Sequence, residues 1–350
     1  MTKVRIKSPL LQMLGIDYPI VQGGLGPFST RNLAAAISNA GALGTVSMPH
    51  SSSPEEAAQK ILEHIHTVQR NTDKHFAVNT PIGSHKASSD RVLDSSAAAI
   101  EAVCKEREKD PDLRERLVLY ITSGGDPSTH HQMIKDAGLI HFHMIGAVRH
   151  GKKAEDLGMD GVMASGYEMG GHTHIADRTA HTMVLVPNVV QALKIPVLAS
   201  GGICDAATLA AALALGAVGV QMGTRFIATK ECEFHENYKK AIVDAQEWGT
   251  VVIPSMLGPG RHLRTPFTYE VIEMQEKVNR GEMDLTEKIQ KVMDAQALSE
   301  DVGDIERGLL LAGMGSQRIN SLLTVQEVID SMVEGAAQII RKLNSDLIEG

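Results

Sequence analysis

Eight short apolar runs recur along the first two thirds of this chain, and they restrict its fold more than any other feature. Each run holds four to six residues, mostly apolar or β-branched, which is typical of strands buried on both faces of a parallel sheet. The runs begin at Pro19, Leu43, His75, Leu117, Ile140, Gly161, Pro196 and Val218. We expect each of them to form a strand.

Helical patterns separate these runs. Ser29 or Thr30 is a suitable N-cap for the first helix, and Gly41 and Gly216 stand where helix C-caps are expected. The clearest patterns are STRNLAAAISNAG, SPEEAAQKILEHIHTVQ, HTMVLVPNVVQALK and CDAATLAAALALG. Eight strands alternating with helices over roughly 220 residues predict an α/β fold of the (β/α)8 type, a TIM barrel. An open doubly wound sheet is the alternative.

The loops after the apolar runs are rich in Gly, Ser, Thr and His, and in a barrel they share the face where active sites are built. Two of these loops suit a phosphate group. Gly201 and Gly202 lie between the seventh run and a helix start, and Gly223 and Thr224 follow the eighth run. Backbone N–H groups there can bind phosphate oxygens, and a helix N-terminus adds a favourable field. Each glycine pair alone is also compatible with a tight turn.

The periodic strand signal stops after Gly223. Residues 230–323 show only patterns of helices and loops, so we expect a mostly helical appendage on a barrel formed by residues 1–229. The segment 324–350 has apolar residues at helical spacing and is expected to pack back on the barrel as a C-terminal helix. Within the appendage, residues 313–316 are the part that we place near a pocket.

The composition argues against several classes of function. The net charge of -8, without a stripe of Lys and Arg, argues against a nucleic-acid partner, and aromatic residues make up only 3% of the chain. No apolar run is long enough for a membrane span, and the N-terminus lacks a signal-peptide pattern, so we expect a cytoplasmic protein. Cys104, Cys204 and Cys232 are too scattered for a CxxC zinc site, and we expect buried, reduced thiols.

The loop after the sixth run, GYEMGGHTHIADRT over residues 166–179, places two glycines directly before His172. Histidine exchanges protons near neutral pH, so such a loop can bring an acid–base group to a ligand. The alternative is a polar loop that happens to contain histidine. The position of this loop on the same barrel face as the glycine pairs favours a site.

These pieces together resemble the nitronate monooxygenase family, formerly called 2-nitropropane dioxygenases, which includes flavin-dependent enoyl-thioester reductases and NADH:quinone reductases. The matching segments span about residues 10 to 235, in order and at the spacing of the family. They are YPIVQGGLG, AISNAGALGTVS, FAVN, SGGDP, AVRHGKKAEDLGMDGV, GYEMGGHT, IPVLASGGI and ALALGAVGVQMGTRFIATKEC.

The resemblance implies a barrel that holds noncovalent FMN at the carboxyl ends of its strands. Gly23 and Gly24 would then run under the isoalloxazine ring, and Asn79 would contact it. His172 matches the family histidine that lies beside the flavin and the substrate. The implied phosphate contacts are Gly201, Gly202, Gly223 and Thr224, and the further implied flavin contacts are Gln22, Ser123, Gly171 and Gln221.

Three positions qualify the resemblance. Some quinone-reductase relatives carry a lysine on the fifth strand where this chain has Met144, which puts a basic flavin contact there in doubt. His174 replaces a small residue common in the family, and a solvated loop histidine is favoured slightly over a second proton carrier. His143 lies in the fifth run, where alternation can point it into the barrel, and we expect a hydrogen-bonded core histidine.

The resemblance implies an FMN-dependent oxidoreductase, and we expect first a nitronate monooxygenase that oxidises alkyl nitronates with O2. His172 would either hold the nitronate anion as an imidazolium or take a proton from a neutral nitroalkane, and neither role needs a metal. The alternative is NAD(P)H-dependent reduction of an enoyl thioester or a quinone, with His172 beside the developing oxyanion. A noncatalytic flavin-binding barrel is a lower alternative. We expect a small-molecule substrate as partner, with a homodimer as one option for assembly.

Overall fold

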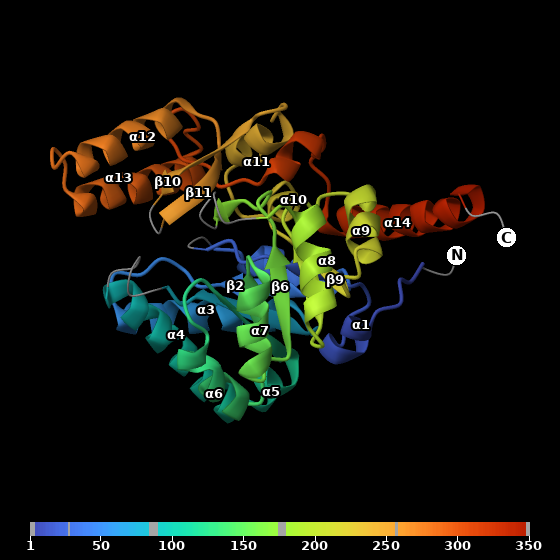
Figure 1. The fold of residues 1–350 in the computed structure, drawn as a ribbon. Helices are drawn as coiled ribbons and strands as arrows, with labels where there is room; N and C mark the ends of the chain where they lie inside the picture. Colours follow the sequence, from blue (N-terminus) through green and yellow to red (C-terminus); the bar gives the residue numbers. More distant parts are fainter. Residues whose placement is uncertain (1–3, 27–28, 84–89, 174–179, 256–257, 348–350) are drawn as a thin grey trace.

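The computed structural model describes residues 4–26, 29–83, 90–173, 180–255 and 258–347 (Figure 1). Its central element is a parallel sheet of eight strands. The strands are β1 (Ile20–Gln22), β2 (Gly44–Ser47), β3 (Phe76–Pro81), β4 (Leu117–Ser123), β5 (Ile140–Ile145), β6 (Gly161–Ser165), β8 (Val197–Ser200) and β9 (Gly219–Met222). Leu43 N donates to Ile20 O at 3.0 Å and Gln22 N donates to Leu43 O at 2.9 Å, which joins the two edges of the sheet. This closure confirms the predicted (β/α)8 barrel over the open sheet.

An outer ring of helices surrounds the strands (Figure 1). Its members are α2 (Arg31–Asn39), α3 (Pro54–Asn71), α4 (Asp90–Lys109), α5 (Pro111–Arg116), α6 (Ser128–Asp136), α7 (Val148–Asp156), α8 (Thr182–Ala192), α9 (Ala206–Ala214) and the single turn α10 (Thr224–Ile227). Local sequence explains their ends. At the start of α3 the Ser53 hydroxyl accepts a hydrogen bond from Glu56 N. Gly41 and Gly216 follow α2 and α9 with φ of 89° and 93°, as predicted for helix ends.

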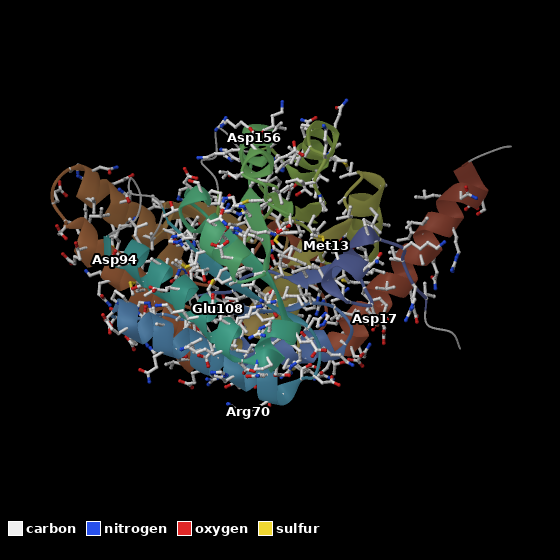
Figure 2. All side chains as sticks on the ribbon, turned by 90° about the horizontal axis from the view of Figure 1, so that it is seen from below. Met13, Asp17, Arg70, Asp94, Glu108 and Asp156 are labelled. Atoms are coloured by element: carbon white, nitrogen blue, oxygen red, sulfur yellow. The ribbon has the colours of Figure 1, made fainter. Side chains whose placement is uncertain are left out.

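Apolar side chains from alternate strand positions fill the inside of the barrel, among them Val21, Ile121 and Phe142. The amino-terminal end of the barrel is covered by α1 (Pro9–Leu14), whose Leu10 and Leu14 belong to the same cluster. Figure 2, seen from below, shows α1 on this side of the molecule. The amino-terminal end of the barrel is therefore closed by packing.

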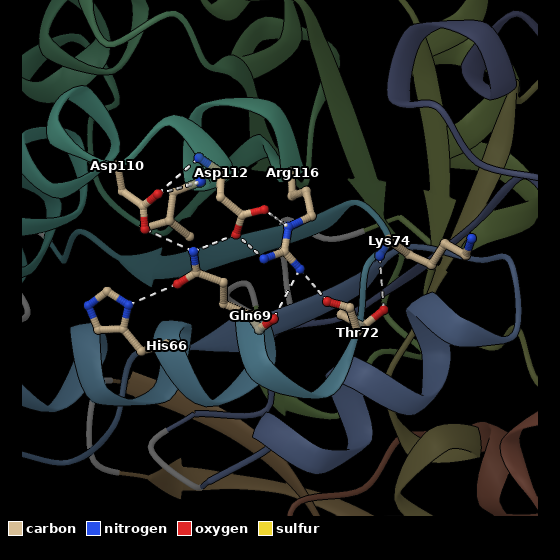
Figure 3. Close-up of polar contacts among 8 residues, drawn as sticks. His66, Gln69, Thr72, Lys74, Asp110, Asp112 and Arg116 are labelled. Carbon is tan, nitrogen blue, oxygen red and sulfur yellow. Dashed lines mark hydrogen bonds and ion pairs between the residues drawn. The ribbon is translucent and has the colours of Figure 1, made fainter.

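A polar network ties the outer helices together near the amino-terminal ends of the strands (Figure 3). Arg116, the last residue of α5, donates to Asp112 and to the carbonyl oxygens of Gln69 and Thr72. The Gln69 amide in turn donates to Asp110 Oδ2 at 2.8 Å and to Asp112 Oδ2 at 2.5 Å. The network links the end of α3 to the start of β4, so it supports the fold at the end of the barrel away from the loops with the predicted site.

The segment after the barrel contains a β-hairpin that the sequence did not predict. β10 (Thr250–Ser255) and β11 (Gly258–Leu263) pair antiparallel, and β11 also pairs with β7 (Gly171–His172) from the sixth barrel loop. The expectation of only helices and loops for residues 230–323 was wrong here. The strands were not predicted because they contain Pro254 and the Gly-Pro-Gly sequence at 258–260, and Pro and Gly are depleted in strands.

The remainder of the appendage is mostly helical. It contains α11 (Glu236–Val243), α12 (Pro266–Asn279), α13 (Leu285–Ala297) and the short turns Leu298–Val302 and Met314–Arg318. Ile253 from the hairpin packs with Val271 and Val292 from α12 and α13. In Figure 1 these elements lie above the carboxyl ends of the barrel strands.

The last helix, α14 (Val325–Leu347), runs along α9 and α2 and extends beyond them (Figure 1). Its Val328, Ile329 and Met332 are buried in the main hydrophobic cluster. The domain boundaries at residues 229 and 323 stay predictions. In the part of the chain that the structure describes, no helix combines the length and the apolar character needed to cross a membrane.

Candidate active site

A cavity of about 680 Å³ lies at the carboxyl ends of the barrel strands. Its volume is in the usual range of small-molecule sites. Barrel loops form most of its lining, and the appendage contributes Ile289, Met293 and Leu311. Of the predicted site residues, those that line it are Gly23, Gly24, Asn79, Ser123, Gly171, His172, Gly201, Gly202, Gln221, Gly223 and Thr224. The barrel therefore brings these residues together, while their individual binding roles stay predictions.

Gln22 is the predicted site residue that the structure places elsewhere. Its side chain is fully buried in the barrel wall, where Oε1 accepts a hydrogen bond from Thr45 N at 3.0 Å. Strand alternation explains this position, because Val21 points into the barrel interior and its neighbour Gln22 must point to the other face. Gln22 is therefore not among the residues that line the cavity, and its contact with a flavin stays a prediction.

Close approach of Asn79 requires a glycine at position 24. A Cβ atom on Gly24 would lie 2.0 Å from Asn79 Oδ1, a separation that no side chain tolerates. Asn79 is held by a hydrogen bond from Nδ2 to Ile121 O at 3.2 Å, so it cannot move aside without losing that contact. Gly23 and Gly24 thus leave a surface without side chains beside a fixed amide, which suits a flat ring.

The predicted phosphate loops lie after β8 and β9. Gly201 and Gly202 have φ of 90° and 77°, a left-handed conformation that favours glycine. Gly223 N-caps α10, and Thr224 is its first residue. At the N-terminus of α9, the Asp205 carboxylate already accepts a hydrogen bond from Thr208 N at 2.9 Å, so this N–H is not available to a ligand. Backbone N–H groups of the glycine loops are the donors that remain.

A third glycine segment, from the appendage, joins these two loops. Gly313 N donates to Thr224 Oγ1 at 2.9 Å, and a Cβ on Gly315 would lie 3.8 Å from the carbonyl carbon of Gly202. Both Gly313 and Gly315 line the cavity, as the sequence predicted for residues 313–316. This side of the cavity therefore combines several backbone segments with little side-chain bulk.

Three lining side chains, those of Gln221, His172 and Thr173, hold buried polar atoms that find no hydrogen-bond partner among the described residues. Gln221 uses Oε1 to accept from Ser200 Oγ at 3.0 Å, which leaves its buried Nε2 unpaired. His172 Nε2 is buried and unpaired in the same way. Buried polar groups are almost always satisfied, so these three atoms at one cavity indicate that a ligand completes the site. A ligand with a flat polar ring and a phosphate, such as FMN, fits this donor set.

Contacts with β11 fix the loop that carries His172. Gly171, with φ of 74°, pairs with Arg261 of β11, and Thr173 N donates to Pro259 O at 2.9 Å. Arg261 also donates from Nη2 to Tyr167 O at 3.0 Å, and its guanidinium carbon lies 4.6 Å from the centre of the Tyr167 ring. The hairpin missed by the sequence thus positions the predicted catalytic residue.

Burial determines the charge of His172. Desolvation lowers its pKa to about 4, so the imidazole is neutral at physiological pH. A neutral imidazole has one nitrogen that accepts a proton and one that donates a hydrogen bond. The site therefore presents a base or a neutral donor and not a preformed cation.

The structure also places the other residues that the sequence analysis discussed. Met144 lines the cavity, whereas His174 lies outside the described residues. Cys204 and Cys232 are buried, as predicted, and burial raises their thiol pKa values to about 11 and about 12. His143 is buried and hydrogen-bonded, as expected, but it also lines the cavity.

The apolar part of the lining was not found from the sequence. Ile289 and Met293 stand four residues apart on α13 and face the cavity together with Phe234 and Leu311. Their spacing indicates one face of a helix, but nothing in it indicates what that face covers. Only the placement of the appendage over the barrel brings these side chains to the site.

Comparison with known proteins agrees with this geometry. A family model described as nitronate monooxygenase matches residues 7–335. A protein of Staphylococcus saprophyticus described as a probable nitronate monooxygenase is 28% identical over 366 residues, covering 97% of this chain and 100% of that protein. FabK from Thermotoga maritima superposes with a TM-score of 0.83 at 29% identity, covering 97% of this chain and 99% of that chain.

A further relative comes from Mycobacterium tuberculosis. It is described as (3aS,4S,5R,7aS)-5-hydroxy-7a-methyl-1-oxo-octahydro-1H-indene-4-carboxyl-CoA dehydrogenase and is 34% identical over 282 residues. The alignment covers 79% of this chain and 71% of that protein.

Proposed function

Because the chain belongs to the nitronate monooxygenase family of oxidoreductases, we propose that it is an FMN-dependent enzyme that oxidises alkyl nitronates with O2. The observation that carries the proposal is His172, an imidazole with a buried Nε2 that lacks a partner among the described residues. It lines the same cavity as the glycine segments and the unpaired Gln221 amide.

The residues that would hold FMN divide into two groups. Gly23, Gly24 and Asn79 would bind the ring, with the Gln221 amide at one of its polar edges. When bound, FMN supplies the electron-accepting chemistry that the side chains of the site lack. The phosphate would be held by backbone N–H groups of Gly201, Gly202 and Gly223 and by Thr224.

His172 would act on the substrate as a neutral group. Its lowered pKa supports the role of proton acceptor from the acidic carbon of a nitroalkane over the role of fixed cation. After it has taken a proton, the imidazolium would hold the nitronate oxygens by a charge-assisted hydrogen bond. The buried position of Nε2 keeps water from competing for that proton.

A second candidate is NAD(P)H-dependent reduction of an enoyl thioester or a quinone. The apolar lining from Ile289, Met293, Phe234 and Leu311 favours it, because a small nitronate needs little apolar surface. The relative from Mycobacterium tuberculosis, whose name describes a carboxyl-CoA dehydrogenase, supports the same class of bulky, apolar thioester. Here His172 would donate a hydrogen bond to the developing oxyanion.

Anaerobic mixing of the purified protein with an alkyl nitronate, and separately with NADH or NADPH, distinguishes the candidates through the flavin absorbance. Rapid bleaching by the nitronate alone supports the monooxygenase. Bleaching by NADH or NADPH alone supports the reductase. Bleaching by no donor leaves the noncatalytic flavin-binding barrel, and a protein that neither contains nor binds FMN overturns all three.

A further inference from the structure

Three histidines and one threonine form a continuous chain of hydrogen bonds from the cavity to the outer helices. His143, which lines the cavity, has its Nδ1 2.8 Å from Thr122 Oγ1. The same hydroxyl lies 2.9 Å from His141 Nε2. His141 Nδ1 in turn lies 3.0 Å from Nδ1 of His131, which is part of α6.

The barrel geometry produces this chain directly. Thr122 on β4 is paired in register with His143 on β5, so their side chains lie on the same face of the sheet. His141 stands two residues before His143 and shares that face, while Phe142 between them points into the barrel interior. α6 packs against β5, and the His131 and His141 ring planes are only 22° apart.

We propose that His143 is a second acid–base group of the cavity and that Thr122, His141 and His131 connect it to the outer surface of the barrel as a proton relay. This inference deepens the proposed function, because an enzyme that takes a proton from its substrate, or gives one to it, must exchange that proton with solvent. It rests on that function for its purpose, but its geometry does not depend on which substrate is used.

The proposed relay assigns a tautomer to each ring from its hydrogen-bond partners. The backbone of Leu157 bonds His131, and because Leu157 N already donates to Lys153 O, the group involved is the Leu157 carbonyl. His131 therefore carries its proton on the nitrogen that faces Leu157 and accepts at Nδ1. It follows that His141 donates from Nδ1 and accepts at Nε2 from the Thr122 hydroxyl.

The same matching of donors and acceptors assigns the tautomer of His143, at the inner end of the relay. Because the Thr122 hydroxyl has one proton and gives it to His141, its oxygen must accept from His143 Nδ1. A neutral His143 then has Nε2 as its proton-accepting nitrogen. The Leu157 carbonyl at the surface thus selects which nitrogen of a cavity histidine acts as the base.

The surroundings of His141, in the middle of the relay, disfavour its protonated form. Burial lowers the pKa of His141 to about 3, and His131, His143, Lys135 and His130 lower it further. Burial also lowers the pKa of His131, with Lys135 acting the same way, but Asp160 and the Leu157 carbonyl oppose both. An extra proton on the relay is therefore expected to be more stable at the outer end, on His131, than on His141.

The transfer is balanced at every atom. A proton that enters at His143 Nε2 displaces the Nδ1 proton to Thr122 Oγ1, and the hydroxyl proton moves to His141 Nε2. The His141 Nδ1 proton then moves to His131 Nδ1, so His131 becomes an imidazolium and releases one proton to water. The reverse sequence returns a proton to the cavity and restores the first set of tautomers.

The test is a nitrogen NMR experiment on the flavin-loaded protein with isotopically labelled histidine, assigned with single His→Gln variants. Near pH 7 we expect neutral rings, with the proton on Nδ1 in His143 and His141 and on Nε2 in His131. A proton on Nε2 of His143 in the wild-type protein overturns the relay. This measurement needs no altered protein beyond those used for assignment.

Thr122→Val removes the hydroxyl and keeps the shape of the side chain. We expect His143 to lose its fixed tautomer, and the proton-coupled flavin reaction to slow by about 10-fold or more. The matched control is Thr80→Val, because Thr80 is also fully buried in the barrel wall but bonds Tyr120 Oη at 2.8 Å. Equal effects of both variants on the His143 signals and on the rate overturn the relay.

The two proposals fail in distinguishable ways. If no donor reduces the flavin, the proposed function fails while the tautomers of the wild-type protein still test the relay. If a donor reduces the flavin but Thr122→Val changes neither the tautomer nor the solvent deuterium isotope effect, the relay fails and the function stands.

Discussion

At the scale of single residues, reactivity in this protein depends on what surrounds a common side chain. Burial lowers the pKa of His172 to about 4 and that of His141 to about 3, so both imidazoles are neutral near pH 7. They differ in partners, because His141 is hydrogen-bonded on both nitrogens whereas His172 Nε2 has no partner among the described residues. His172 Nε2 is therefore available to bind a ligand. His141, with both nitrogens hydrogen-bonded, suits proton transfer between its two partners.

Replacing His172 by Asn should slow flavin reduction by the preferred donor by about 10² to 10⁴, the usual range for losing a positioned acid or base. FMN content and thermal stability should stay near those of the wild-type protein, because Gly171 and the pairing with β11 shape the loop. Stopped-flow absorbance measures the rate. His174→Ala is the control, and an equal loss in both variants would mean that the loop acts as a unit.

Gly202→Val should weaken FMN binding by at least about 10-fold. The φ of 77° costs an L-residue about 1–2 kcal/mol, and the new Cβ would also approach the Glu168 side chain at 3.3 Å beside the expected phosphate. Gly281→Val is a matched control, because Gly281 has φ of 74° with open space around it and does not line the cavity. Fluorescence titration with FMN compares the two, and equal affinities would place the phosphate elsewhere.

At the scale of elements, the hairpin of β10 and β11 clamps the sixth barrel loop. β11 pairs with Gly171 and His172 on one side of this loop. On the other side, a Cβ on Gly170 would lie 2.5 Å from Gly313 N, and Met314 N donates to Glu168 O at 2.9 Å. The loop is therefore held between two appendage segments, and the position of His172 depends on elements outside the barrel.

Arg261→Lys should reduce the rate of flavin reduction by about 10-fold while FMN stays bound. Lysine cannot reproduce the forked contacts of the guanidinium with Tyr167 O and Thr250 Oγ1. Arg264→Lys is the control, because Arg264 is exposed on the same segment and contacts Trp248 O. If both variants react as fast as the wild-type protein, the clamp does not position His172.

At the scale of the whole molecule, Glu233 joins the appendage to the barrel, and Glu300 is partly buried near it. Glu233 accepts hydrogen bonds from Asn32 N at 2.6 Å and Leu33 N at 3.3 Å, so it caps barrel helix α2 from outside. Burial raises the pKa of Glu300 to about 9, and Asp301 and Glu233 add to the effect. Glu300 is therefore protonated in the folded protein at neutral pH.

This pKa makes stability depend on pH with a defined sign. The folded protein keeps the Glu300 proton up to about pH 9, whereas the unfolded chain releases it above its ordinary value of 4.5. Stability from this group is thus full below pH 4.5 and is lost as pH rises toward 9. Glu300→Gln should raise the melting temperature at pH 8 by roughly 2 to 5 °C and change it little at pH 5.

Glu287→Gln is the control for this change, because the Glu287 side chain is 54% exposed on α13. Differential scanning calorimetry at the two pH values measures both variants. A Glu300→Gln protein that melts no higher than the wild-type protein at pH 8 would show that Glu300 is ionised in the folded state.

The sequence by itself determined the barrel and most of the candidate lining. Each strand appears as a local apolar run, and each glycine loop follows its strand within a few residues, so both signals lie inside short windows of the chain. Since the carboxyl ends of parallel strands in a barrel meet on one face, the order of runs and loops was enough to place His172 beside Gly201 and Gly223.

Only the tertiary structure decided the features that depend on register, closure and distant pairing. The Gln22 side chain points away from the cavity because of strand alternation, and β11 pairs with both β10 and the distant β7. The relay through Thr122 needs β4 and β5 aligned in one register and α6 laid over them. Such contacts join residues through space, and their free energy depends on neighbours that no short stretch of sequence contains.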